Sequence, residues 1–292
     1  MNMKCPICDN ETYESVCEKC GYMLENDYMM NHFLTKLSQK EIEDYEKHLS
    51  MYRKLYHGYH EDPYQDKNIE QLLAEAYSYF RMDEYSKAFE IYSKVIERED
   101  NITAYEWLGY LYKEGQGTSK NYEKAYDYFK KASNLGSAYA MNQLGKIYED
   151  GLGVIKNGQR AIDYYKKAAD LGNIESMFNI GYNYENGKGV IQDHLEAKKW
   201  YEKAIEFNHA GAYNNLGIMY ENGQGVKKDL KKAFELYEKS ASLGNKYAMY
   251  NIGLIYEYGK GKIKNNKKAK EWYQKSAELG HEDARKRLDE LK

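Results

Sequence analysis

The sequence predicts an all-α fold, an α/α superhelical solenoid of helix–turn–helix repeats. The stretch from residue 104 to residue 280 repeats itself five times at a spacing of 36 residues. Glycines stand at fixed positions in every unit, and 21 of the 23 glycines of the chain lie between residues 101 and 280. Self-similarity with a fixed period on this scale is typical of stacked units that cannot bury their apolar faces alone.

The first half of each unit is predicted to be a helix that ends in a glycine turn. In the third unit Ser176, Ile180 and Tyr184 share one helical face. A glycine follows the Leu or Ile of every unit, and glycine inside a helix costs about 1 kcal/mol relative to alanine. We therefore expect another helix to approach closely there. The Gly-x-Gly pair that comes next suits a turn with positive φ. The helix glycines are Gly109, Gly145, Gly181, Gly217 and Gly253.

The second half of each unit is predicted to be an aromatic-rich helix. A small residue is followed by an aromatic pair or near-pair, such as Trp200-Tyr201, and then by Lys-Ala or Lys-Ser. The small residues let helices approach, and the aromatic rings should fill the space between units. Leu-Gly closes four of the units, and Asn208 replaces the glycine in the third. Because asparagine is the usual substitute for glycine in a left-handed helix cap, this exception supports the prediction.

The combined pattern A-x-x-x-L-G-x-x-Y-x-x-G-x-G, then K-A-x-x-W/Y-Y-x-K-A and L-G, resembles the Sel-1-like repeat, a relative of the tetratricopeptide repeat. The resemblance covers five units, about three fifths of the chain. Thr118 and Lys262 depart from it by replacing the hydrophobic residue after Gly-x-Gly, and Glu196 replaces the basic residue before Ala197. The resemblance implies an α/α solenoid that serves as a scaffold for protein complexes.

The segments on either side of the repeats are also predicted to be helical. Residues 69–101 have the spacing of a degenerate tetratricopeptide unit, which should cap the stack. Residues 38–57 form an amphipathic helix that either packs against the solenoid, which we favour, or forms a short coiled coil. Gly58–Lys67 is the best hinge, and Leu288 and Leu291 are the apolar contacts of a charged closing helix. The predicted organisation is a metal knuckle at 1–22, a helical linker and hinge at 23–66, the tetratricopeptide-like unit at 67–101, the five repeats at 102–280 and the capping helix at 281–292.

The four cysteines of the chain all lie in its first 20 residues, as two C-x-x-C pairs. Four thiolates at this spacing can surround one tetrahedral ion, and zinc is the expected metal because it favours sulfur ligands and has no redox chemistry. The segment resembles a short zinc ribbon, with one structural zinc. Two disulfides, a redox motif and an iron–sulfur cluster are the alternatives, and we favour zinc because no signal peptide precedes the cysteines. The predicted ligands are Cys5, Cys8, Cys17 and Cys20.

Composition and motifs favour binding over catalysis. No apolar run is long enough to span a membrane, and we expect a cytoplasmic protein. The chain contains no H-E-x-x-H, Walker or G-x-S-x-G motif, so we expect no enzyme and no small-molecule substrate. Residues 1–100 carry a net charge of −9 and residues 101–292 a net charge of +6. The lysines between 260 and 270 could meet nucleic acid or an acidic protein, but a solvated outer helix face is the favoured interpretation.

The leading functional hypothesis is an adaptor that binds a protein or peptide along the concave face. First-helix positions that are not used for packing should form this face. Aromatic rings would anchor a partner there, and asparagine amides would hydrogen-bond its backbone. For Asn179, Asn215 and Asn251, whose position is commonly asparagine in the family that the repeats resemble, a structural role is at least an equal alternative. A zinc-ribbon nucleic-acid binder that uses the solenoid for assembly is the second hypothesis. By analogy with tetratricopeptide grooves, the predicted contacts are Asn142, Phe178, Asn214 and Tyr250, then Tyr110, Lys146 and Tyr182, with Asn179, Asn215 and Asn251 alongside.

Overall fold

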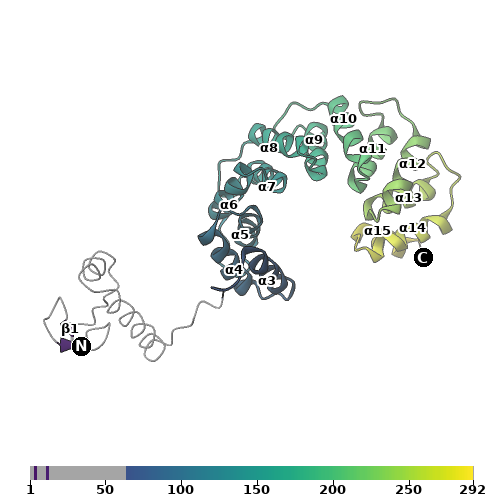
Figure 1. Ribbon diagram of the computed structural model, residues 1–292. Helices are drawn as coiled ribbons and strands as arrows, with labels where there is room; N and C mark the ends of the chain where they lie inside the picture. The colour runs from purple at the N-terminus through teal and green to yellow at the C-terminus, as the bar shows by residue number, and fades with distance from the viewer. Residues whose placement is uncertain (1–2, 5–10, 13–63, 292) are drawn as a thin grey trace. The chain divides into compact units, whose positions relative to one another are not determined.

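The computed structural model describes residues 3–4, 11–12 and 64–291, in two compact units, Met1–Asn68 and Ile69–Lys292 (Figure 1). In the first unit, strands β1 (Met3–Lys4) and β2 (Glu11–Thr12) pair antiparallel, with Met3 opposite Thr12. The four cysteines, the helix predicted over 38–57 and most of the predicted hinge lie outside the described residues. The zinc ligands Cys5, Cys8, Cys17 and Cys20 therefore stay a prediction.

The second unit is an all-α solenoid, which confirms the predicted class for this part of the chain. Helices follow one another in hairpin pairs, and the first helix of each pair lies on the inner side of a curve (Figure 1). The helices are α3 (Ile69–Arg81), α4 (Tyr85–Arg98), α5 (Ile102–Glu114), α6 (Tyr122–Asn134), α7 (Ala138–Asp150), α8 (Gly158–Asp170), α9 (Ile174–Asn186), α10 (His194–Glu206), α11 (Ala210–Asn222), α12 (Leu230–Ser242), α13 (Lys246–Tyr258), α14 (Asn266–Glu278) and α15 (Glu282–Glu290).

The turns adopt the backbone conformation that the glycines predict. Each first helix of the five repeats ends at a left-handed glycine, for example Gly151 with φ 76°. The second helices are followed by a left-handed glycine in four units and by Asn208, with φ 58°, in the third. At the start of the helices, a side chain such as Asn157 accepts a hydrogen bond from a backbone N–H of the first turn. Caps at both ends therefore satisfy groups that a helix leaves unpaired.

The glycine inside each first helix makes room for an aromatic ring of the second helix. A Cβ atom placed on Gly145 would lie 2.4 Å from Cε1 of Tyr165, and the other four units repeat this contact. The expected close approach is thus confirmed, and the ring is the group that approaches. These rings, Phe129, Tyr165, Tyr201, Tyr237 and Tyr273, are fully buried and form the centre of the core.

Aromatic and aliphatic contacts join the repeats to the elements at their two ends. Trp107 of α5 packs against Phe80 of α3, with ring centroids 4.4 Å apart, and stacks on Tyr92 of α4. At the other end Leu288 and Leu291 pack against the core of the last repeat, as predicted. In the part of the chain that the structure describes, no helix is both long and apolar enough to cross a membrane.

Candidate functional site

The predicted contact residues lie on α5, α7, α9, α11 and α13, the inner helices of the repeats. Tyr182 is exposed, and most of the others are half-buried. Binding of a partner by these residues stays a prediction. Their surroundings nevertheless separate side chains that are already engaged within the solenoid from those with free surface.

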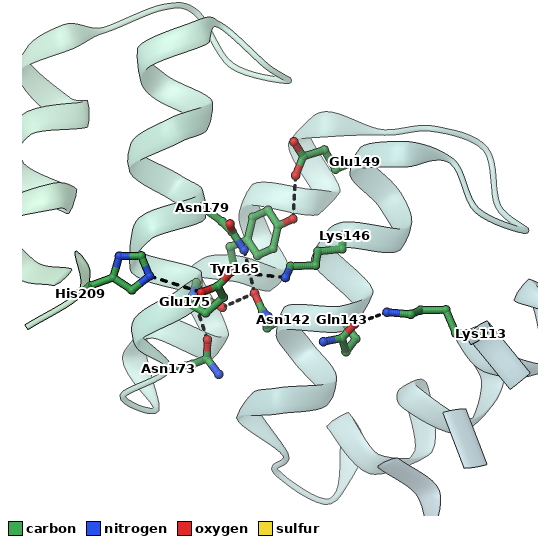
Figure 2. Close-up of polar contacts among 11 residues, drawn as sticks. Lys113, Asn142, Gln143, Lys146, Glu149, Tyr165, Asn173, Glu175, Asn179 and His209 are labelled. Atoms are coloured by element: carbon green, nitrogen blue, oxygen red, sulfur yellow. Dashed lines mark hydrogen bonds and ion pairs between the residues drawn. The ribbon is translucent and has the colours of Figure 1, made fainter. Parts of the chain in front are cut away.

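Asn142 and Asn214 are buried, with only 3% and 6% of their surface exposed. The Oδ1 atom of Asn142 accepts hydrogen bonds from Ser176 Oγ at 2.9 Å and from Asn179 Nδ2 at 3.0 Å (Figure 2). The Oδ1 atom of Asn214 accepts one from Asn251 Nδ2 at 3.0 Å. The assumption that these two positions are not used for packing is therefore wrong, because each carbonyl oxygen links its own unit to the next.

Phe178 and Tyr250 are half-buried because each lies against the histidine that caps the start of the next inner or closing helix, α11 or α15. The Phe178 ring stacks on His209 and the Tyr250 ring on His281, with centroids 4.6 Å apart in both cases. Both histidines are helix caps whose Nδ1 accepts a backbone N–H, from Ala212 and from Ala284. Burial lowers the pKa of His281, which favours the neutral imidazole that an Nδ1 acceptor requires.

A chain of polar contacts joins Lys146, Glu175 and His209 beside Phe178. Lys146 Nζ lies 3.5 Å from one carboxylate oxygen of Glu175, and His209 Nε2 lies 3.4 Å from the other (Figure 2). These contacts, with that of His209 first, hold the pKa of Glu175 below its usual range. Lys146 is thus engaged within the solenoid, although part of its side chain is exposed.

A second kind of polar contact ties each buried tyrosine to the first helix of its own unit. The Tyr165 hydroxyl donates to Glu149 at 2.7 Å (Figure 2), and three other units repeat the pair with Tyr201, Tyr237 and Tyr273. Burial, together with the carboxylate, raises the pKa of Tyr165. The first repeat has Phe129 and Lys113 at these two positions, and Lys113 Nζ instead donates to Gln143 of the second repeat at 3.2 Å.

The contacts between units alternate between two kinds along the stack, a pattern that the sequence had not led us to expect. Asn142 and Asn214 stand at one repeat position, and the cap that follows each is an asparagine, Asn173 or Asn245. Phe178 and Tyr250 stand at the same position in the intervening units, and there the cap is histidine. The spacing from His209 to His281 is the same 72 residues as from Phe178 to Tyr250, which is the signal that could have revealed it.

Asn183 of α9 is a polar residue in a core position. It is 1% exposed, and neither side-chain polar atom has a hydrogen-bond partner among residues 64–291. The same position is apolar and buried in the other four repeats, as Leu111, Ile147, Met219 and Ile255. Asn183 is therefore the least well-satisfied core side chain of the repeats.

Comparisons with known proteins agree with this architecture. The Sel1 repeat profile matches residues 102–137, 138–173, 174–207, 210–245 and 246–281, and a tetratricopeptide repeat profile matches residues 72–101. The chain is similar to a Sel1 repeat protein from Oxalobacter formigenes, with 31% identity over 77% of this chain and 89% of that one, and a TM-score of 0.70. A comparison with curated proteins gave no significant match.

A second similar structure is c5321, a protective antigen of uropathogenic Escherichia coli strains that displays an SLR fold. It shares 29% identity and a TM-score of 0.66, and the match covers 78% of this chain but half of that protein.

Proposed function

This chain belongs to the Sel1 repeat family, whose members mediate protein–protein interactions and are generally non-catalytic, and from that premise we propose that it is a cytoplasmic adaptor. In this proposal an extended or helical segment of a protein partner lies along the inner face of the solenoid. The partner is recognised by its backbone and by apolar side chains, and no substrate is turned over.

One row of side chains on the inner helices is the observation that carries this proposal. The row occupies the same repeat position in all five units, directly after the glycine of the Leu/Ile-Gly pair, so its members follow one another along the solenoid. All are at least partly exposed, and four of the five are aromatic or aliphatic. Amphipathic and apolar side chains on a rigid scaffold make good anchors for a peptide. The inner row is Tyr110, Lys146, Tyr182, Ile218 and Leu254.

The side chains beside this row are held rigid by contacts between units. Asn179 and Asn251 each donate from Nδ2 to an asparagine of the preceding unit, and Asn215 donates to Tyr201 Oη at 3.0 Å. A face that is already ordered loses little conformational entropy when a partner binds, which favours affinity. The asparagines thus support the row in this proposal, and the row itself makes the contacts.

The test compares two double variants with the native chain. We expect Tyr182→Ala with Leu254→Ala to abolish capture of a partner, because truncation of a central anchor costs about 2 kcal/mol or more. Lys264→Ala with Lys267→Ala, at exposed lysines away from the row, should leave capture intact. The partner would be identified by co-purification and mass spectrometry, and its binding segment retested as a pure peptide by calorimetry. Equal binding of the peptide by the native chain and the row variant would refute the proposal.

We also propose that Cys5, Cys8, Cys17 and Cys20 hold one structural zinc ion. The support is the pair of C-x-x-C motifs, since four thiolates fill a tetrahedral site and leave no open position for catalysis. These thiols would have to stay reduced to bind metal, which is why the proposal places the protein in the cytoplasm.

Binding of nucleic acid, the second hypothesis, has less support. The lysines between 260 and 270 are the densest basic cluster, yet several are engaged within the solenoid. Lys260 pairs with Glu221 at 2.7 Å, Lys262 lies over the Phe234 ring, and Lys268 lies over the Tyr256 ring. These contacts engage much of the cluster within the solenoid, with Lys260 and Lys262 in the turn between α13 and α14 and Lys268 on α14.

A further inference from the structure

A cleft lies at the junction of the first two Sel1 repeats, separate from the inner row. Its volume is about 340 Å³. Three cations and three tyrosines line it: Lys130, Arg160 and Lys167, with Tyr126, Tyr148 and Tyr164. Asp163 is the carboxylate in its lining.

Hydrogen bonds in the cleft leave it with more donors than acceptors. Lys130 Nζ donates to Tyr164 Oη at 2.9 Å, so the Tyr164 hydroxyl proton remains to be donated elsewhere. Arg160 Nη1 donates to Tyr148 Oη at 3.4 Å, and Tyr148 Oη lies 3.1 Å from Tyr126 Oη. Whichever of these two hydroxyls donates to the other, one proton of the pair is left over.

The net charge of the cleft is positive, and the hydroxyl of Tyr126 is a neutral donor near pH 7. The hydrogen bond with Tyr148, together with burial, raises the pKa of Tyr126 to about 12. Within residues 64–291, Lys130, Arg160 and Lys167 form no ion pair with a carboxylate and lie instead over tyrosine rings. Asp163 accepts a hydrogen bond from Gln159 Nε2 at 3.0 Å. Three cations and one carboxylate leave the lining with a charge of +2.

The other junctions between repeats show that this set is not required by the fold. A cation over the tyrosine of the first helix recurs, for example Lys232 over Tyr220 and Lys268 over Tyr256. What does not recur is the full set of three cations with three tyrosines. At the three later junctions, the residues equivalent to Lys130 are Lys166, Glu202 and Glu238. The residues equivalent to Arg160 are Glu196, Lys232 and Lys268. The residues equivalent to Tyr126 are Ile162, Lys198 and Phe234.

We propose that this cleft binds the phosphoryl group of a phosphate monoester. The guanidinium of Arg160 and the ammonium of Lys130 supply charge-assisted hydrogen bonds, and the hydroxyls of Tyr164 and Tyr126 or Tyr148 supply neutral ones. A dianionic group would match the charge of +2 and use the surplus protons. Such a group comes either from a small phosphorylated molecule or from a phosphorylated side chain of a bound protein, and both present the same chemistry to the cleft.

The experiment is calorimetric titration of the full chain at constant ionic strength. The probes are inorganic phosphate and O-phospho-L-serine, with L-serine and succinate as controls. We expect saturable binding of both phosphoryl probes, weakened about tenfold by Lys130→Met and by Arg160→Gln, since each removes a charge-assisted hydrogen bond. Lys268→Gln, which removes the equivalent cation at the fourth junction, should leave the affinity unchanged. Circular dichroism would show that each variant is folded.

A phosphoserine peptide, titrated in the same way, distinguishes the two sources of the group. Tighter binding of a phosphoserine peptide than of O-phospho-L-serine would indicate a phosphorylated side chain, and equal binding a small phosphorylated molecule. The proposal is wrong if neither phosphoryl probe binds saturably, if succinate binds as tightly as they do, or if Lys268→Gln weakens binding as much as Arg160→Gln. None of these outcomes depends on the inner row, so this site can fail while the adaptor function stands.

Discussion

Replacing Asn183 by leucine should stabilise the protein. The amide is buried, and neither of its side-chain polar atoms is hydrogen-bonded within residues 64–291. A buried polar group without a partner costs about 1–3 kcal/mol. Burial of a leucine side chain contributes about 1.5–3 kcal/mol, part of which is lost where the larger side chain strains its surroundings. Leu111 occupies the same position in the first repeat, so the position accepts this shape. We expect a net gain of about 2 kcal/mol.

Scanning calorimetry would measure this gain as a rise in the melting temperature. For a protein of this size about 2 kcal/mol corresponds to about 4–8 °C. Asn186→Leu is the matched control, because Asn186 is exposed on the same helix and its substitution should change stability by at most about 0.5 kcal/mol. If Asn183→Leu melts at or below the temperature of the native chain, the amide has a stabilising partner and our reasoning is wrong.

Three further predictions address the metal, the histidine caps and the tyrosine–glutamate pairs. Reduced protein should contain about one zinc per chain, and Cys17→Ser should lose it; metal analysis that finds none in the native chain would contradict this. Burial lowers the pKa of His281, so the stability that its neutral form contributes is present above pH 6.5 and is lost as the pH falls below that value. Thermal melts at pH 7.5 and 5.5 should therefore differ less in His281→Asn than in the native chain. Tyr201→Phe should lower the free energy of unfolding by about 1.5–3 kcal/mol because it removes the hydrogen bond to Glu185. Adding Glu185→Lys, which recreates the first repeat's combination, should recover part of that loss in chemical denaturation.

Much of the solenoid could be predicted because its signals are local. A helix glycine such as Gly145 or a left-handed cap such as Asn208 depends on residues of the same unit, and both expectations were confirmed. The inner-helix positions that remain free to contact a partner were harder to predict. Asn142 is engaged by residues 34 and 37 positions later, so its burial depends on how one unit sits on the next. The apolar periodicity within one helix carries no information about contacts with residues that far along the chain.

The role of the histidines could not be predicted from single sequence positions either. Taken one by one, the seven histidines look scattered. His209 becomes informative only when it is paired with Phe178, whose ring it stacks on. Comparing each repeat with the next but one, instead of with its neighbour, would have brought the pair to light.

The alternation between units has a consequence for how such a chain can lengthen. Phe178 and the His209 cap it stacks on fall within one segment of 36 residues, and so do Asn142 and the cap Asn173. A gene duplication that copies such a segment therefore copies both members of the combination together. Residues 138–209 and 210–281 each carry the asparagine cap first and the histidine cap second, so a copy of either block would continue the alternation. Lengthening by such a two-repeat block would extend the inner face and keep each side chain next to the cap residue that it contacts.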